Sequence, residues 1–445
     1  MSEMKVGRNA APLRLIPRGS WVALGVTWLI WAINAFDREV ILRLGPVISD
    51  HFDLSPEAWG GITSLIMFAL AIFPIYASRM SDKHGVGWKR AAFQVPLVIG
   101  YNLISAITGI KAVANNLVVF IALRIGVNLG AGAGEPIGIS NTTEWWPKER
   151  RGFALGVHHT GYPIGALLSG LAVAWVLKTF GDDNWMYVFF IGLIVSIPVM
   201  MFWKWYSTRE RIQETYRVIE ENGMTVPIDP EQEAIHAEAE DAVGKCLRNK
   251  VVMLTSGTTM LTQIVYMGIN YVLPLYLANI MGLDFSQAAA YSIVFTITGA
   301  LGQIFWPTLS DYLGRRKTIL LCGVWMAIGV GGFYFVSNIS MYVALQLFFG
   351  LVANAVWPVY YAAATDNAPD GAHGTANGFI TTAMFIGGGL APILMGWLIG
   401  LGGGWEAAAG YNYTFLFMAG CAILGVVLQL FIPKGTLEVK EDSTN

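Results

Sequence analysis

Three consecutive charged residues, Asp37, Arg38 and Glu39, interrupt a run of apolar residues that extends from Trp21 to Ile48. An ionised group in hydrocarbon costs about 2.5–3.5 kcal/mol even on the most lenient insertion scale, so such residues commonly serve a charged solute or a proton. A guanidinium can hold an anion through two parallel hydrogen bonds, and a buried carboxyl can exchange a proton. Glu39 lies about 200° around a helix from Asp37, so we expect it to pair locally with Arg43.

Few other ionisable residues lie inside apolar stretches, and they are Arg124, Glu135 and the pair His158–His159. Their spacing places Arg124 and Glu135 on one face of a helix, about 16 Å apart. Depth counted from the loops puts Arg124 near Asp37 and Arg38, and the two histidines near Glu135. We expect an outer cluster in which two guanidiniums face one carboxylate and leave positive charge for an anion, and an inner cluster around Glu135.

Each of these groups also has a plainer interpretation. Asp37 and Arg38 could neutralise each other as a buried pair, Glu135 could bond to neighbouring helices, and the histidines could only pack helices together. Arg124, however, has no acidic residue in its own segment except Glu135. We therefore predict that Arg38 and Arg124 bind an anion, and that Asp37, Glu135 and His159 exchange protons.

The second half of the chain has only neutral polar residues inside its apolar stretches, among them Tyr266, Asn270, Gln303, Gln346 and Asn354. Aligning VFIALRIGV (119–127) with MYVALQLFF (341–349) puts Gln346 opposite Arg124. This asymmetry predicts that the first half handles charge and protons, whereas Tyr266, Asn270, Gln346 and Asn354 bind the neutral part of a substrate.

The elements that must position these residues are membrane-spanning helices. Of the 445 residues, 55% are hydrophobic and 13% are charged, and the mean hydropathy is +0.53, whereas soluble domains carry about 25% charged residues. Apolar runs of helical length predict twelve spans, at about residues 19–48, 58–80, 90–111, 116–143, 152–178, 185–206, 250–281, 286–309, 317–337, 340–365, 375–400 and 411–432. The chain is therefore predicted to be an all-α membrane protein.

The longest polar stretch, residues 207–249, divides the spans six and six. We expect an N-terminal tail (1–18), two six-helix bundles (19–206 and 250–432) and a C-terminal tail (433–445). All Lys and Arg fall in the tails, the 207–249 stretch and the loops on the same side, except Arg38, Arg43, Lys111, Arg124 and Lys178. The positive-inside rule then predicts that both termini and the central stretch are cytoplasmic in the cell (inner) membrane.

The loop after the second span of each half repeats a pattern: SRMSDKHGVGWKR (78–90) and PTLSDYLGRRK (307–317). Each has an acid followed by a basic cluster, which can pair and cap the next helix. The chain here resembles the major facilitator superfamily, whose signature is GxxxDxxGRRK in both loops. The resemblance implies two bundles related by a pseudo-two-fold axis along the membrane normal, a substrate site between them, and a gating role for Asp82, Arg90, Asp311, Arg315 and Arg316.

The segment EWWPKERRGFALGVHHTGYPIGALLSG (144–170) resembles the anion:cation symporter branch of that family. The resemblance implies functional roles for Asp37, Arg38 and Arg124, and proton-driven uptake of hexuronates, galactonate or other sugar acids. The branch often places an acid where this chain has Ala131, so Glu135 would be a displaced substitute. Substrate contacts are also implied at Tyr162 and Thr381, where departures from the branch pattern make an aromatic, short-chain or sulfonated anion as credible as a sugar acid.

We therefore predict a monomeric secondary transporter that takes up a small organic anion with protons. Two alternatives remain: a proton-driven exporter of amphipathic compounds, and a membrane receptor for solutes. The sequence has no HExxH motif and no nucleophile–base motif, and its three cysteines lack metal-ligand spacing. We accordingly expect no enzymatic activity, no cofactor or metal and no nucleic-acid partner, with the lipid bilayer as the surroundings.

Overall fold

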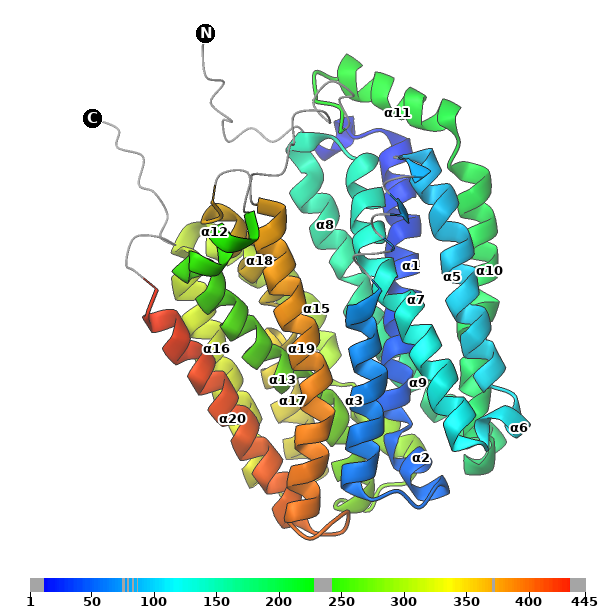
Figure 1. Cartoon of the computed structure of the whole chain (residues 1–445), viewed down its shortest axis with the longest axis vertical. Coiled ribbons are helices and arrows are strands. Elements are labelled where there is room, and N and C mark those ends of the chain that lie inside the picture. The colour runs from blue at the N-terminus through cyan, green and yellow to red at the C-terminus, as the bar shows by residue number, and fades with distance from the viewer. Residues whose placement is uncertain are drawn as a thin grey trace.

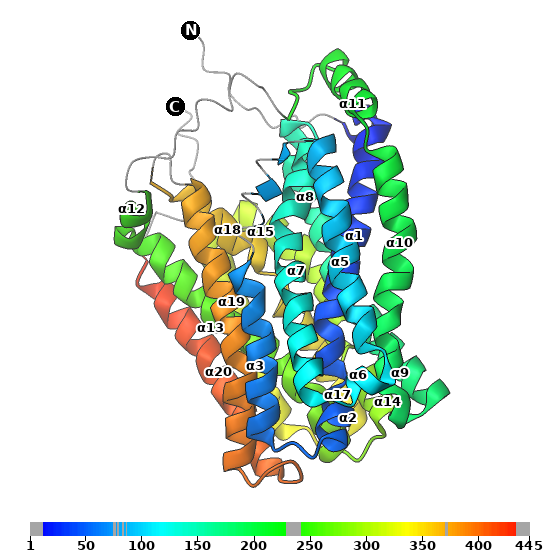
Figure 2. The same cartoon turned by 45° about the vertical axis from the view of Figure 1, so that its right-hand side comes forward.

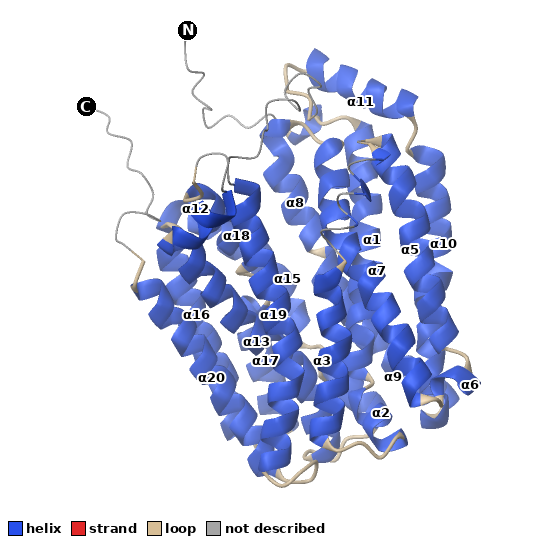
Figure 3. Cartoon of the chain, viewed as in Figure 1, coloured by secondary structure: helices blue, strands red, loops and turns tan. Residues whose placement is uncertain are grey.

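Helices make up almost all of the described chain, and its described residues contain no strand (Figure 3). The computed structural model describes residues 12–432 apart from 74–76, 78–79, 82–83, 86, 228–241 and 370–372. The first half contains α1 (Arg18–Arg43), α2 (Gly45–His51), α3 (Pro56–Ile72), α5 (Trp88–Thr108), α6 (Lys111–Ala114), α7 (Leu117–Glu144), α8 (Arg151–His159), α9 (Gly161–Phe180) and α10 (Phe189–Tyr206).

Two shorter helices, α11 (Arg209–Glu221) and α12 (Ala242–Arg248), precede the second half. That half contains α13 (Lys250–Asn279), α14 (Phe285–Tyr291), α15 (Phe295–Leu313), α16 (Arg315–Gly332), α17 (Ile339–Ala353), α18 (Trp357–Asp366), α19 (His373–Leu401) and α20 (Ala408–Leu430). Among the described residues, 11 helical segments are long and apolar enough to cross a membrane, or up to 12 if the bent pair α2–α3 counts as one span. The predicted all-helical membrane protein is thereby confirmed.

Besides the first predicted span, which runs from α1 into α2, three predicted spans are each built from two helices. The fifth is α8 and α9, which join at Thr160; the eighth is α14 and α15; and the tenth is α17 and α18, which join across Asn354–Val356. Proline explains two of these breaks, because Pro163 and Pro358 stand in the first turns of α9 and α18, where a missing backbone N–H costs no helical hydrogen bond. Both breaks lie beside residues that prove to line the cavity described below.

The hydrogen bonds that join the two halves lie towards one end of the helices. Figures 1 and 2 show α11 at one end of the bundle and α2 at the other, and we call these ends the α11 side and the α2 side. Six hydrogen bonds join described residues of the two halves, and their partners lie towards the α2 side: Arg43 to Asn270 (twice), Tyr271 to Pro56, Ser286 to Ala174, Ile393 to Ser64 and Trp405 to Leu54.

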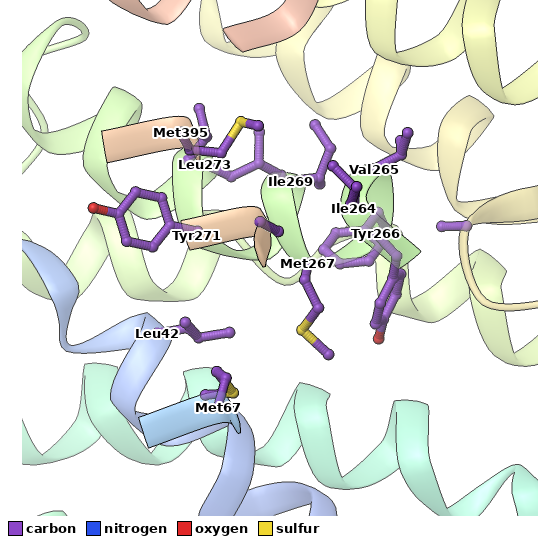
Figure 4. Close-up of a cluster of buried hydrophobic side chains, with 14 of the residues drawn as sticks. Leu42, Met67, Ile264, Val265, Tyr266, Met267, Ile269, Tyr271, Leu273 and Met395 are labelled. Atoms are coloured by element: carbon purple, nitrogen blue, oxygen red, sulfur yellow. The ribbon is translucent and has the colours of Figure 1, made fainter. Parts of the chain in front are cut away.

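An apolar cluster fills the same interface (Figure 4). Leu42 and Met67 of the first half and Met267 of α13 in the second half belong to this cluster, and all three are buried. The helices α3 and α19 come close enough for backbone contact because Gly60 and Gly396 have no side chains. A Cβ on Gly396 would lie 2.3 Å from the carbonyl oxygen of Pro56. Small residues that allow close backbone approach are typical of helix pairs in membranes.

This contact predicts a stability effect for Gly396→Ala. The added methyl group cannot fit against the Pro56 carbonyl, and forced overpacking of this kind costs about 1–3 kcal/mol. We expect a Tm lower by several degrees in detergent. Gly420→Ala is the matched control, because it lies in the helix α20 and its Cβ would meet nothing within 4 Å. An equal Tm for the two variants would contradict the predicted clash.

The α11 side carries the repeated loops. Arg90 donates to Glu144 at 2.7 Å and to Ser81 at 2.9 Å, and the Gly87 N–H donates to Glu144 at 2.6 Å. In the second half, Arg315 donates to Asp366 at 3.4 Å and to Ser310, and Arg316 donates to the backbone carbonyls of Gln429 and Leu430. The repeat therefore extends to the contacts, because Arg90 and Arg315 each pair with an acid at the end of the fourth span of their half. Asp82 and the Asp311 side chain lie outside the described part, and the gating role stays a prediction.

Candidate functional site

A cavity lies between the two halves, and both halves line it. The first half contributes Trp31, Arg38, Glu135, His159 and Tyr162, and the second contributes Gln263, Tyr266, Met267, Gln303, Asn354, Trp357, Tyr361 and Met384. Its volume is about 40 Å³, which holds no more than a few water molecules. A carboxylic acid of ordinary size therefore requires the surrounding helices or side chains to move apart.

The charged end of the cavity consists of Arg38 on α1 and Glu135 on α7. The Arg38 Nη1 atom lies 3.9 Å from the Glu135 Oε2 atom, beyond hydrogen-bond distance. The rings of Trp31 and Tyr162 hold the guanidinium, with their centroids 5.8 and 5.3 Å from it. Arg38 Nε and Nη1 and Glu135 Oε2 have no hydrogen-bond partner among the described residues. The pair thus has two donors and one acceptor unused, and both of its residues line the cavity.

Asp37 points away from the cavity into the first half. Its carboxylate accepts a hydrogen bond from Ser105 of α5 at 2.9 Å. Arg124 of α7 donates to the same hydroxyl at 3.1 Å and to the Asp37 backbone carbonyl at 2.6 Å. The α10 backbone covers the carboxylate, because a Cβ on Gly192 would lie 3.0 Å from both carboxylate oxygens. Asp37 and Arg124 are fully buried and do not line the cavity.

Glu39 points in a third direction, towards α9 and α13. It forms an ion pair with Arg43 at 2.9 Å, as the spacing predicted, and it also accepts a hydrogen bond from the Tyr162 hydroxyl at 2.8 Å. Arg43 in turn donates to the side chain and the backbone carbonyl of Asn270 in the second half. These four residues therefore form one continuous chain of hydrogen bonds.

Helix geometry explains why three neighbouring residues have three environments. Successive side chains on a helix point about 100° apart, so Asp37, Arg38 and Glu39 cannot share one site. Depth alone had grouped Arg38 with Arg124, and that grouping is wrong: Arg38 lies beside Glu135, and Arg124 lies beside Asp37. The expected surplus of positive charge is also wrong, because each guanidinium has its own carboxylate.

The other predicted site residues divide into two groups. Tyr162, Tyr266, Asn354 and His159 line the cavity; His159 also bonds through Nδ1 to the Leu155 carbonyl at 2.7 Å. The remaining three do not line it: Asn270 accepts from Arg43, Gln346 bonds to the backbones of Phe295 and Tyr291 within the second half, and Thr381 lies behind Tyr361 at 3.0 Å. His158 is buried and stacks on Trp31.

Sequence reasoning missed most of the aromatic and sulfur-containing wall: Trp31, Met267, Trp357, Tyr361 and Met384. It noted Gln303 only as a polar residue of the second half. Spacing could have found some of them, since Trp31 stands two helical turns before Arg38 and shares its face. Gln263 and Tyr266 also have i, i+3 spacing. Apolar residues, however, carry no signal that separates a cavity wall from a helix–helix contact.

Gln303 and Asn354 each keep one unused polar atom at the neutral end of the cavity, and the hydroxyl of Tyr266, another lining residue, also has no hydrogen-bond partner among the described residues. The break in the tenth span leaves the backbone carbonyl of Asn354 without a helical partner. Gln303 donates to this carbonyl at 3.0 Å. The Trp357 indole donates to the Asn354 side chain at 2.5 Å. Gln303 Oε1 and Asn354 Nδ2 have no partner among the described residues. They offer one acceptor and one donor, opposite a charged end that can bind a carboxylate.

Two packed groups of candidate membrane helices with a charged cavity between them are the arrangement expected of a solute transporter. The chain belongs to the Major Facilitator Superfamily, whose sequence profile matches residues 27–294 and 255–444. It is therefore a multi-pass membrane transporter rather than an enzyme, and its substrate is a small molecule.

The relatives carry different substrates. The chain is 24% identical over 417 residues to the hexuronate transporter of Bacillus subtilis (strain 168), covering 89% of this chain and 90% of that protein. It is 25% identical over 414 residues to the gentisate transporter of Corynebacterium glutamicum, covering 91% of this chain and 86% of that protein. The crystal structure of a bacterial homolog to the human lysosomal transporter Spinster matches with a TM-score of 0.70 at 18% identity, covering 93% of this chain and 96% of that chain; this match shows the fold alone.

Proposed function

We propose that this protein imports a small organic anion together with protons, by alternating access. The observation that carries the proposal is the Arg38–Glu135 pair, which faces the cavity at 3.9 Å with hydrogen-bonding atoms unused. Proton transfer to Glu135 would remove the charge that competes for Arg38, so that an incoming carboxylate could take the guanidinium donors. Loss of that proton on the other side of the membrane would return Glu135 to Arg38 and release the anion.

Charge balance supports the coupling to protons. The buried charged residues of the described chain are four acids and four arginines: Asp37, Glu39, Glu135, Glu144, Arg38, Arg43, Arg90 and Arg124. A monoanion that entered alone would leave an unbalanced charge, and burying one costs several kcal/mol. Protonation of one carboxylate restores neutrality. We therefore propose at least one proton for each negative charge on the substrate.

The same structure supports a proposal for the side from which the cavity is accessible. The hydrogen bonds between the halves lie on the α2 side, so that side is the more firmly closed. Arg90, Arg315 and Arg316 lie on the α11 side, which the positive-inside rule assigns to the cytoplasm. We propose an orientation with both termini cytoplasmic in the cell membrane and a state closed to the outside.

The cavity wall favours an aromatic acid over a sugar acid. Five of its residues are aromatic and two are methionines, namely Trp31, Tyr162, Tyr266, Trp357, Tyr361, Met267 and Met384. A sugar acid would need hydrogen-bond partners for several hydroxyl groups, because an unpaired polar group in a buried site costs about 1–3 kcal/mol. The unused atoms of Gln303 and Asn354 suffice for one hydroxyl or amide, and the Tyr266 hydroxyl suffices for one more. We therefore propose an aromatic carboxylate, with sugar acids and sulfonates as the competing classes.

A screen on the purified protein tests the substrate class. Benzoate, gentisate, galacturonate and sulfoacetate are compared for the rise in Tm that each produces at equal concentration, because a ligand that binds the folded state raises its stability. We expect the aromatic carboxylates to give the largest rise. A larger rise with galacturonate would contradict the aromatic assignment.

Glu135→Gln tests the coupling, because glutamine cannot release a proton. In proteoliposomes, we expect the variant to lose accumulation driven by a pH gradient, whereas exchange of labelled for unlabelled anion continues. Anion-dependent proton uptake should vanish with the accumulation. Glu221→Gln is the matched control, since Glu221 is exposed on α11. Full pH-driven accumulation by Glu135→Gln would contradict the proposal that Glu135 couples proton transfer to transport.

A further inference from the structure

The hydrogen-bonded chain Tyr162–Glu39–Arg43–Asn270 connects the cavity wall to the contact between the halves. Tyr162 lines the cavity, and its hydroxyl donates to Glu39 Oε1 at 2.8 Å. Glu39 Oε2 accepts from Arg43 at 2.9 Å. Arg43 then crosses to α13, where it donates to Asn270. The chain thus starts in the first half, at the site, and ends in the second half.

Burial strengthens the hydrogen bonds of Glu39 and Arg43. The side chains of Glu39 and Arg43 are 1% and 0% exposed, so water does not compete for them. Hydrogen bonds to charged groups in such surroundings are stronger than neutral ones, and a buried charge that loses a partner is costly. Glu39 and Arg43 are one helical turn apart on α1 and move together. The bonds to Asn270 are the only ones in the chain that separation of the halves must break.

The second half also joins this arrangement to the cavity. The Asn270 side chain donates to the Tyr266 carbonyl at 2.8 Å, one turn earlier on α13, and the Tyr266 side chain lines the cavity. On the other side, the Tyr162 ring lies 5.3 Å from the Arg38 guanidinium. A ligand on Arg38 therefore contacts the ring whose hydroxyl holds Glu39.

We infer that Tyr162, Glu39, Arg43 and Asn270 form a latch that couples the state of the cavity to closure on the α2 side. This inference rests on the proposed function, because alternating access requires that side to open. Displacement of the Tyr162 hydroxyl removes one donor from Glu39, which then holds Arg43 more tightly and weakens its bonds to Asn270. Tyr162, Glu39 and Arg43 are thus positioning residues, and opening follows from a change at the cavity.

A cysteine-labelling experiment on the full-length protein in cells tests the latch without any substrate. Cys246, Cys322 and Cys421 are replaced by serine, and Ser64→Cys provides a probe at the α3–α19 contact, where Ser64 accepts from the Ile393 N–H. A membrane-impermeant maleimide then reports how often the α2 side opens. Asn270→Leu removes the side-chain acceptor of Arg43, and we expect labelling about tenfold faster, as for the loss of one hydrogen bond to a charged group.

Coupling is measured by a double-mutant cycle. Tyr162→Phe alone should speed labelling about threefold, through loss of its hydrogen bond to Glu39. Combined with Asn270→Leu, Tyr162→Phe should increase the labelling rate little further, because the side-chain bond from Arg43 to the second half is already absent. Multiplied effects in the double variant would mean independent residues and would overturn the inference.

Two further variants keep the outcome decisive. Asn270→Asp offers Arg43 a carboxylate, so we expect labelling several-fold slower than in the parent; unchanged or faster labelling would overturn the latch even if Asn270→Leu failed to fold. Asn279→Leu is the matched control on the same helix, since Asn279 bonds only to Tyr411 within the second half. A proton-uptake assay on the parent, run separately, decides the proposed function, because labelling depends on opening and not on solute coupling.

Discussion

Arg38→Lys is expected to reduce uptake by at least about 100-fold. The residue is the cavity's only arginine among the described lining residues, and lysine keeps its charge but cannot bind a carboxylate through two parallel bonds. Lysine would also lose the stacking on Trp31 and Tyr162. In the proposed complex, the Arg38 guanidinium and the substrate carboxylate form a buried, hydrogen-bonded charge pair. Truncation of one partner of such a pair costs about 2–5 kcal/mol, which supports an effect of this size.

The measurement is initial uptake of labelled anion in proteoliposomes, with the amount of inserted protein matched. We expect the loss to appear mainly as a raised KM, because the ground-state grip on the anion is weakened. Arg217→Lys is the matched control, since Arg217 lies two-thirds exposed on α11. Retention of more than a tenth of the parent uptake by Arg38→Lys would contradict anion binding at this residue.

Arg124→Gln is expected to destabilise the folded protein rather than only to slow its uptake of the anion. The change leaves Asp37 fully buried without its neighbouring cation, and removal of one partner of a buried pair costs about 3–5 kcal/mol. We expect a Tm lower by several degrees and a reduced yield of folded protein. The loss of uptake that accompanies Arg124→Gln would then report on folding.

The double variant Asp37→Asn/Arg124→Gln separates stability from coupling. Both charges disappear together, and the Ser105 hydroxyl can still bridge the two amides, so most of the lost stability should return. If Asp37 takes part in proton exchange, as the sequence predicts, pH-driven uptake should remain absent. Recovery of both stability and pH-driven uptake would show that this pair has a purely structural role.

The sequence was sufficient to predict the fold and to identify most of the charged residues that are buried among the helices. Hydropathy and the repeated loops predicted the all-helical membrane architecture, and the i, i+4 spacing predicted the Glu39–Arg43 pair. The grouping of the buried charges failed because depth along a helix says nothing about which face a residue occupies relative to other helices. Only packing decides that Arg124 faces Asp37 and Arg38 faces Glu135.

Neutral residues were harder to assign. Gln346 and Asn354 look alike in the sequence, yet Gln346 bonds two backbone groups inside the second half, whereas Asn354 lines the cavity. The difference arises from the break after Asn354, which frees backbone groups beside the cavity. The aromatic wall was predicted least well, because a tryptophan that faces a cavity and one that faces another helix satisfy the same hydropathy pattern.

The divergence of Asp37, Arg38 and Glu39 limits how α1 can move during transport. Turning the helix about its own axis by one residue, about 100°, would take all three side chains out of their surroundings at once. Tilting α1 together with α5, α7 and α9 keeps the contacts of Asp37 with Ser105 and of Glu39 with Tyr162. Among the bonds that join these charged residues to their surroundings, the tilt strains those of Arg43 to Asn270. The three adjacent charged side chains thus fix the rotation of α1 about its own axis. We therefore expect α1 to move during transport by tilting with its neighbours and not by rotating.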